Sequence, residues 1–400
     1  MNERANTRRG TSRWSRRSQS GVLYSNRLID ELTEAVLAHE EVARYLSGSH
    51  GLTGDAARER VITYLDELRT TQRYELYRAL EYPLYPILRK IERVGENVSG
   101  AVEAAQRHRI VYASNHRSHT DYLIEPLVLD DAGIRPPIIA AGINLFGGPL
   151  GFIHKYVTGA LPIRRHTKDP AYLITLKAYV GELLHKHDLF FYPEGGRSYS
   201  GELKSCKVGL FSACLHSDVQ NLVFLPTAIA YDLVLEDHVL ARQKVKRRQR
   251  PFSREIAEMV RFAVGYRSRA FVTFGRPIPI DAYDPSSRRS VLELTHLVRR
   301  SIGQLYKVLP TALVASAMRP SIERRELISR IDSILDTLRA VGANLDVKSG
   351  EEALEAAVEP FEARGIIVSE NGRFRVRERN VLRYYGRSIQ HLLSPDGLTH

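Results

Sequence analysis

A histidine and an aspartate five positions apart are the side chains of this chain best suited to acid–base chemistry. His116 and Asp121 lie in Asn115-His-Arg-Ser-His-Thr-Asp-Tyr-Leu-Ile-Glu125, directly after the apolar run 110–113. An imidazole can take a proton from an alcohol near neutral pH, and a nearby carboxylate can fix its tautomer and stabilise the imidazolium that forms. The pattern therefore predicts activation of a hydroxyl group.

The pair can meet only if the backbone changes direction between its two members. On one ideal helix successive residues turn by about 100°, so side chains five apart would point to well-separated sides. We therefore expect His116 in a loop and Asp121 in the first turn of a helix that begins after Ser118. Two alternatives stay open. Ser118 and Asp121 have the spacing of a capping box, in which the carboxylate only satisfies amides at a helix start, and His119 is a second candidate base.

Two downstream segments carry arginines suited to binding an anion. Gly159-Ala-Leu-Pro-Ile-Arg-Arg165 ends in Arg164 and Arg165, and Phe191-Tyr-Pro-Glu-Gly-Gly-Arg-Ser-Tyr-Ser-Gly201 contains Arg197. Planar guanidinium groups hold phosphate oxygens in a bidentate fashion that lysine cannot copy. The arginines therefore indicate a phosphate-bearing substrate.

The Glu-Gly-Gly sequence in the second of these segments follows a predicted strand. Gly195 and Gly196 let the backbone turn sharply there and bring N–H groups close to an anion. Glu194 can orient an arginine or a substrate hydroxyl. For two glycines alone, a plain loop without a ligand is the alternative.

Together with Leu225-Pro-Thr-Ala-Ile-Ala-Tyr-Asp232, these segments resemble in order the four sequence blocks of the glycerol-phosphate acyltransferases, the phospholipid-synthesis enzymes with an H-x-x-x-x-D motif. The tail Asn380-Val-Leu-Arg-Tyr-Tyr-Gly-Arg-Ser-Ile-Gln-His-Leu-Leu393 resembles the end of the same proteins. The chain departs from the family pattern at several positions: Pro162 stands in place of Phe, Tyr199 in place of Arg and Asp232 in place of Glu, and Thr227-Ala228 is less bulky than the common aliphatic pair.

The resemblance implies transfer of a fatty acyl group from acyl-CoA or acyl carrier protein to the sn-1 hydroxyl of glycerol 3-phosphate, giving lysophosphatidic acid without a further cofactor or a metal. It implies His116 as general base, Asp121 as its orienting group and Pro226 on the acyl-donor side. The phosphate would be bound by Arg164, Arg165, Glu194, Gly195, Gly196, Arg197 and Ser198. The departures leave dihydroxyacetone phosphate or another polar alcohol open as acceptor.

Two other classes of protein stay possible. A Ser-His-Asp hydrolase could use Ser114, Ser118 or Ser198, although the chain has no G-x-S-x-G sequence. A non-enzymatic lipid-binding or nucleic-acid-binding protein is the second alternative. Formation of an acyl-enzyme would support the hydrolase, and binding without turnover would support the second class.

The charge of the chain suits an anionic partner. Its 400 residues carry 58 Lys and Arg against 46 Asp and Glu, a formal charge of +12, which fits a membrane surface, an acidic carrier protein or nucleic acid. Residues 1–20 predict a disordered basic tail without the apolar segment of a secretory signal. A basic run, Arg242–Arg250, predicts binding to anionic lipid or an acidic carrier, with a solvated loop as the alternative. We expect a cytoplasmic protein peripheral on the cytoplasmic face of the membrane, with no nucleic-acid partner.

Cysteine usage and apolar segments add two exclusions. Cys206 and Cys214 are the two cysteines, so a disulfide framework is excluded and reduced cytosolic thiols are expected. They lack metal-ligand spacing. The uncharged stretch Pro136–Ile153 approaches the length of a membrane span, but its glycines and prolines would leave backbone groups unsatisfied in hydrocarbon. We predict a buried strand, a turn and a helix there.

Periodicity predicts an α/β fold: a layered mixed sheet with flanking helices, a helical N-terminal part and a small α+β C-terminal region. The expected domains are a basic tail at 1–20, helices at 21–100, the α/β domain at 101–310 and the C-terminal region at 311–400. Predicted helices cover 25–46, 54–93, 169–186, 322–341 and 351–364, and predicted strands cover 110–113, 138–141, 189–192, 222–231 and 270–274. Asn371-Gly372 predicts a hairpin over 366–376. Two helices before a hairpin are winged-helix-like, which keeps a nucleic-acid module open.

Overall fold

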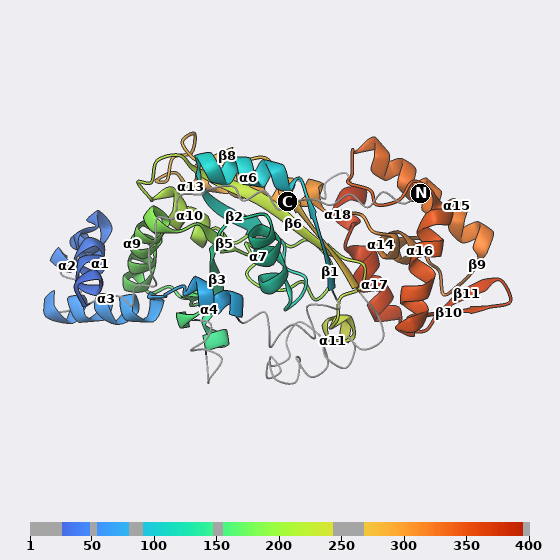
Figure 1. Cartoon of the computed structure of the whole chain (residues 1–400), viewed down its shortest axis with the longest axis horizontal. Coiled ribbons are helices and arrows are strands. Elements are labelled where there is room, and N and C mark those ends of the chain that lie inside the picture. Colours follow the sequence, from blue (N-terminus) through green and yellow to red (C-terminus); the bar gives the residue numbers. More distant parts are fainter. Residues whose placement is uncertain (1–25, 49–53, 80–90, 147–154, 243–267, 395–400) are drawn as a thin grey trace, which may run out of the picture.

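The computed structural model describes residues 26–48, 54–79, 91–146, 155–242 and 268–394 (Figure 1). The tail at 1–20, nearly all of the basic run Arg242–Arg250 and most of the helix predicted after residue 146 lie outside these ranges. Along the long axis of the molecule, a group of N-terminal helices lies at one end, a large sheet in the middle and the C-terminal helices at the other end.

The central element is an eight-stranded mixed sheet. Its spatial order is β1-β7-β6-β2-β5-β3-β4, with β8 pairing with β6. The bounds are β1 (Ile91–Glu96), β2 (Arg109–Ser114), β3 (Ile138–Gly142), β4 (Leu161–Ile163), β5 (Leu189–Phe191), β6 (Leu222–Tyr231), β7 (Ser268–Phe274) and β8 (Ile278–Pro279). The strands from β6 to β4 are mutually parallel, and β7 runs antiparallel to β6. The expected layered mixed sheet is therefore confirmed.

Helices cover both faces of this sheet, so its central strands are apolar in continuous runs. In β2, Ile110 and Tyr112 pack into the core on one face, while Val111 and Ala113 pack into the core on the other. The first face is covered by α6 (Val98–Arg107) and α7 (Asp121–Asp131), and the second by α9 (Pro170–Lys186), α10 (Gly209–Leu215) and α13 (Arg288–Leu305). This burial on both sides fixes β2 and the loop that follows it.

The N-terminal part contains α1 (Asn26–Ala38), α2 (Glu40–Ser47), α3 (Gly54–Leu68) and α4 (Tyr74–Ala79). The long helix predicted over 54–93 is wrong. It ends at Leu68 because the next segment takes backbone partners elsewhere: the Thr71 and Arg73 amides donate to the Lys155 and Val157 carbonyls. Strand β1 also starts the sheet before residue 101, where the domain boundary was expected.

The C-terminal region contains α14 (Pro310–Ala317), β9 (Ser321–Glu323), α15 (Arg324–Ala340), α16 (Gly350–Ala363), β10 (Ile367–Glu370), β11 (Arg373–Val376), α17 (Arg379–Arg387) and α18 (Gln390–Leu393). The hairpin at Asn371-Gly372 is confirmed, with positive φ at both residues. Strand β9 was not predicted. It pairs with β11, so the order helix, strand, two helices, hairpin is that of a winged helix.

Two short elements complete the description, the 3₁₀ helix η1 (Ile143–Phe146) and α11 (Asp237–Arg242). Within the described ranges, none of the helices combines the length and the apolar character needed to cross a bilayer.

Candidate active site

The site lies at the carboxyl ends of the parallel strands, where the loop after β2 leads into α7. An open cavity of about 670 Å³ is present there. Its lining includes His116 and His119 from the loop after β2, Arg164 and Arg165 after β4, and Arg197 from the loop after β5. The sheet therefore brings residues of the first three blocks to one cavity.

His116 and Asp121 are in contact as the spacing predicted. The loop carries His116, Asp121 is the first residue of α7, and His116 Nδ1 lies 2.8 Å from Asp121 Oδ2. The same Oδ2 accepts the backbone amides of Arg117 at 2.6 Å and Ser118 at 2.9 Å, while Oδ1 accepts the Tyr231 hydroxyl at 2.7 Å. One carboxylate therefore both orders the loop and contacts the imidazole, so the capping and the orienting interpretations are compatible.

These contacts define the chemical state of His116. Because Asp121 accepts hydrogen bonds only, His116 Nδ1 carries the proton and Nε2 is left with a free lone pair for a substrate proton. Burial lowers the pKa of His116 to about 4, although the charge of Asp121 opposes the shift. The imidazole is therefore neutral at pH 7, as a general base must be. The Tyr192 ring stacks on it, with centroids 4.1 Å apart.

A second carboxylate, Glu125, lies one helical turn beyond Asp121 and is fully buried. It accepts the Ser114 hydroxyl at 2.5 Å and the Tyr192 hydroxyl at 2.9 Å. Burial and the nearby charge of Asp121 raise the pKa of Glu125 well above its usual range. Through Tyr192 this residue supports the ring that stacks on His116. Sequence reasoning missed Glu125, although its spacing of four from Asp121 places both on one face of α7.

Two cations flank the Gly195-Gly196 turn. Gly195 has φ of +72°, a conformation that favours glycine, and a Cβ added there would lie 3.3 Å from Lys207 Cγ. A Cβ on Gly196 would lie 3.7 Å from Arg165 Nη1. Arg165 is exposed and lines the cavity together with Lys207. The turn thus separates two positive side chains that face a common space, and Lys207 was not predicted from the sequence.

Arg197 lies deeper, at 7% exposure, with Nη1 3.4 Å from Glu236 Oε1. Glu236 is fully buried and also accepts the Ser118 hydroxyl and the His119 amide. It therefore joins the loop after β2 to the arginine of the third block. No local pattern reveals Glu236, because its partner Ser118 is 118 positions away in the chain.

Three of the residues predicted to bind phosphate have other contacts in the structure. Arg164 forms a two-pronged ion pair with Glu67 of α3, at 2.7 and 2.5 Å. Glu194 accepts the backbone amides of His116 and Lys204. The Ser198 amide donates to the His116 carbonyl, and its hydroxyl donates to the Glu202 carbonyl. Glu194 and Ser198 therefore hold the first and third blocks together, and neither lines the cavity.

Pro226 also lies away from the cavity lining. It is buried within β6, where it pairs in register with Ala113 of β2, and its carbonyl accepts the Gly275 amide at 2.8 Å. This position supports the sheet beneath the loop that carries His116. A contact of Pro226 with an acyl donor stays a prediction.

The sequence of the chain is similar to the sequences of known acyltransferases. Residues 96–230 match the family model described as Acyltransferase. The chain is 30% identical over 323 residues to a glycerol-3-phosphate acyltransferase of Aeromonas hydrophila subsp. hydrophila, an alignment that covers 73% of this chain and 40% of the relative. The chain thus spans less than half the length of that relative. A solved structure of the 1-acyl-sn-glycerophosphate acyltransferase PlsC from Thermotoga maritima is 12% identical, with a TM-score of 0.33 over 70% of this chain and 92% of that one.

Proposed function

Because the chain belongs to the glycerol-3-phosphate acyltransferase family, we propose that it transfers a fatty acyl group from a thioester to the sn-1 hydroxyl of glycerol 3-phosphate, giving lysophosphatidic acid. The observation that carries this proposal is the contact of His116 with the buried Asp121 at a cavity that is also lined by cations. The thioester is acyl-CoA or acyl carrier protein.

The proposed reaction needs one base and no acyl-enzyme. His116 Nε2 takes the proton of the substrate hydroxyl, and the resulting oxygen nucleophile attacks the thioester carbonyl. The tetrahedral intermediate expels the thiolate, which takes the proton back from the imidazolium. Asp121 stabilises that imidazolium and keeps the ring in the productive tautomer. The ester bond forms, the thioester bond breaks and the base returns to its neutral state.

The lining of the cavity fits both substrates. Arg165, Lys207 and Arg197 supply positive charge for a phosphate, and a guanidinium can bind two of its oxygens. The lining also includes apolar and aromatic side chains that suit an acyl chain: Tyr122, Leu123, Ile139, Leu173, Leu176 and Leu210. Arg164 contributes through its ion pair with Glu67 rather than as a free phosphate ligand.

The contacts of the serine residues argue against a serine hydrolase. Ser114, Ser118 and Ser198 donate their hydroxyls to Glu125, Glu236 and the Glu202 carbonyl, respectively. A nucleophilic serine would instead hydrogen-bond to the base. Because the hydroxyls are committed to other acceptors, direct transfer is favoured over an acyl-enzyme.

We also propose that the protein is peripheral on the cytoplasmic face of a membrane and uses its basic segments there. Exposed apolar side chains at Leu76, Ile143 and Tyr156 would suit the interface. Lipid attachment through basic residues weakens with added salt. Co-sedimentation with anionic vesicles at rising salt tests this part of the proposal separately from catalysis.

The reaction itself is tested with purified protein, lipids, palmitoyl thioesters and a panel of alcohols. Thiol release and the lipid product are followed together with glycerol 3-phosphate, dihydroxyacetone phosphate and glycerol. We expect product with glycerol 3-phosphate, equimolar thiol and no burst of acyl-enzyme. A stoichiometric burst would establish the hydrolase-type route, and binding without turnover of any thioester would refute an enzymatic role.

A further inference from the structure

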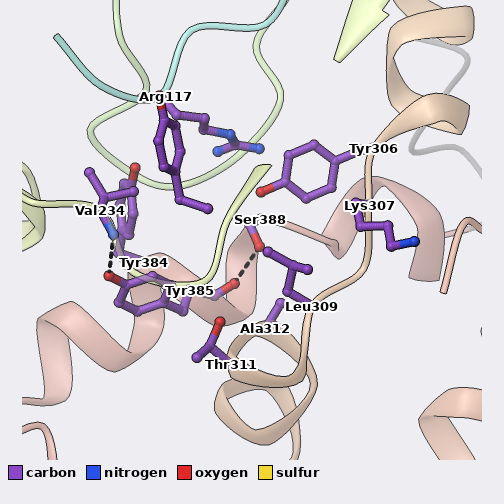
Figure 2. Close-up of a pocket in the computed structure, with 11 residues that line it drawn as sticks. Arg117, Val234, Tyr306, Lys307, Leu309, Thr311, Ala312, Tyr384, Tyr385 and Ser388 are labelled. Carbon is purple, nitrogen blue, oxygen red and sulfur yellow. Dashed lines mark hydrogen bonds between the residues drawn. The ribbon is translucent and has the colours of Figure 1, made fainter. Parts of the chain in front are cut away.

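A second, small cavity lies where the loop that carries His116 meets helices α14 and α17 (Figure 2). Its volume of about 10 Å³ is about that needed for one water molecule. It shares no lining residue with the large cavity. Arg117, the residue after the proposed base, reaches into it from the loop, and Thr311 and Tyr384 reach it from the two helices.

The cavity gathers polar groups that have no protein partner. Arg117 is only 2% exposed, its Nη1 donates to the Gly201 carbonyl, and its guanidinium carbon lies 4.8 Å from the centre of the Tyr306 ring. Its Nε and Nη2, and the hydroxyls of Thr311 and Tyr384, are buried without a hydrogen-bond partner among the described residues. A buried polar group without a partner destabilises the fold, and one water in the cavity can bond to several of these groups.

The loop of the third block is part of the same junction. Gly201 has φ of +89°, and a Cβ there would lie 1.9 Å from the Tyr384 carbonyl oxygen. Gly201 therefore lies between the Arg117 side chain and the backbone of α17, where a side chain on this residue would clash. At the edge of the junction, Arg387 of α17 pairs with Glu202 at 3.3 Å. The loops of the first and third blocks thus share one anchoring point on the C-terminal region.

We propose that Arg117 is a positioning residue that holds the His116 loop and the Arg197 loop in register against α17, with one ordered water completing its hydrogen bonds in the small cavity. The inference rests on the proposed acyl transfer. The Arg117 amide also donates to Asp121 Oδ2 at 2.6 Å. A displaced Arg117 side chain therefore shifts the backbone beside the contact between His116 and Asp121. A misplacement of about 1 Å can lower a rate by about 10².

The test compares Arg117→Lys and Tyr384→Phe with a matched control, Tyr112→Phe. Tyr112 is also buried with an unpartnered hydroxyl, but it lies within β2 and outside both cavities. We expect Arg117→Lys to lower kcat about 10- to 100-fold and Tyr384→Phe about threefold, with both KM values within about twofold. In the variants, water that reaches the loosened loop should reduce the burial of His116. The pKa that limits kcat/KM on the acid side of its pH profile should therefore rise from about 4. The control should match the wild type.

Folded variants that keep the wild-type kcat and the wild-type acid-side pKa of kcat/KM would overturn the proposal, even if their melting temperatures fall. If Arg117→Lys does not fold, Tyr384→Phe and Thr311→Val decide the question by the same two readouts.

If the wild type transfers no acyl group, the proposed function fails while the junction remains testable by hydrogen exchange. Faster exchange of 115–121 and 195–203 in Tyr384→Phe than in Tyr112→Phe would then support the coupling, and equal exchange would refute it.

Discussion

Replacing Asp121 by asparagine separates its charge from its hydrogen bonds. Oδ2 accepts from His116 and from the amides of Arg117 and Ser118, whereas Oδ1 accepts from the Tyr231 hydroxyl. An amide NH₂ cannot accept from two backbone N–H groups, so the asparagine oxygen should take the Oδ2 position. Its NH₂ group would then donate to the Tyr231 oxygen, which can accept. The loop and the tautomer of His116 should survive.

The loss that remains is electrostatic. Two unit charges about 4 Å apart interact by about 4 kcal/mol at an effective dielectric constant near 20. Since each 1.36 kcal/mol is about tenfold in rate, losing the charge that stabilises the imidazolium lowers kcat by up to about 10³-fold. Stability should fall by about 1–2 kcal/mol, because a hydrogen bond to a neutral acceptor is weaker than one to a carboxylate.

The assay is thiol release with saturating thioester and phosphorylated alcohol, measured from pH 6 to 8. The rate loss should not depend on pH there, because removing Asp121 removes a group that raises the pKa of His116 and so leaves the ring neutral. Asp232→Asn is the matched control, since Asp232 is a buried carboxylate that accepts two backbone amides outside the cavity. A melting temperature that falls while kcat stays within threefold would refute the orienting role and leave helix and loop capping alone.

Three further changes test other parts of the site and the fold. Arg165→Lys should raise KM for the phosphorylated alcohol about tenfold and leave KM for the thioester unchanged. Equal effects of this change on both substrates would contradict a phosphate-binding role for Arg165. The control, Arg164→Lys, should mainly lower the melting temperature because it weakens the ion pair with Glu67. His391 has its pKa lowered to about 4 by burial, so its contribution to stability is complete above the unfolded pKa near 6.5 and is lost as pH falls. Denaturant titrations should show that between pH 7 and 5 the wild type loses about 2 kcal/mol more of its free energy of unfolding than His391→Gln does. Identical pH slopes for the two proteins would refute this. Neutralising the run Arg242–Arg250 should weaken vesicle attachment or raise KM for an acyl carrier, and unchanged values for both would leave a solvated loop.

The parts of the fold that could be predicted are those set by neighbours in sequence. The strand before His116, the hairpin at Asn371-Gly372 and helix α9, where the Asp169 side chain caps the first turn by accepting the Ala171 amide, each depend on a local pattern. Strand β1 was missed because it is an edge strand with one buried side chain, Ile91, so its sequence carries little of the alternation that identifies a strand. The helix predicted over 54–93 covered its first three residues instead.

The contacts of the candidate site likewise divide into those between sequence neighbours, which could be predicted, and those between distant residues, which could not. His116 and Asp121 are five positions apart, and the turn between β2 and α7 is enough to bring them together. Arg164 and Arg197 were recognised as cations, but their partners Glu67 and Glu236 lie 97 and 39 positions away. Residue type therefore predicted the charge of the site, and only the packing of α3 and of the segment after β6 decides which carboxylate each arginine pairs with.

The winged-helix order of the C-terminal region raises the question of whether it binds nucleic acid. In a winged helix the second helix of the pair, here α16, would face the groove. Its exposed side chains include Glu351, Glu352, Glu355, Glu359 and Glu362, and the helix contains no lysine or arginine. Nucleic-acid binding depends on cations that replace counterions along the phosphates. A row of carboxylates on α16 would repel that backbone, so the topology is better explained as a scaffold that presents α17 to Arg117 and Gly201.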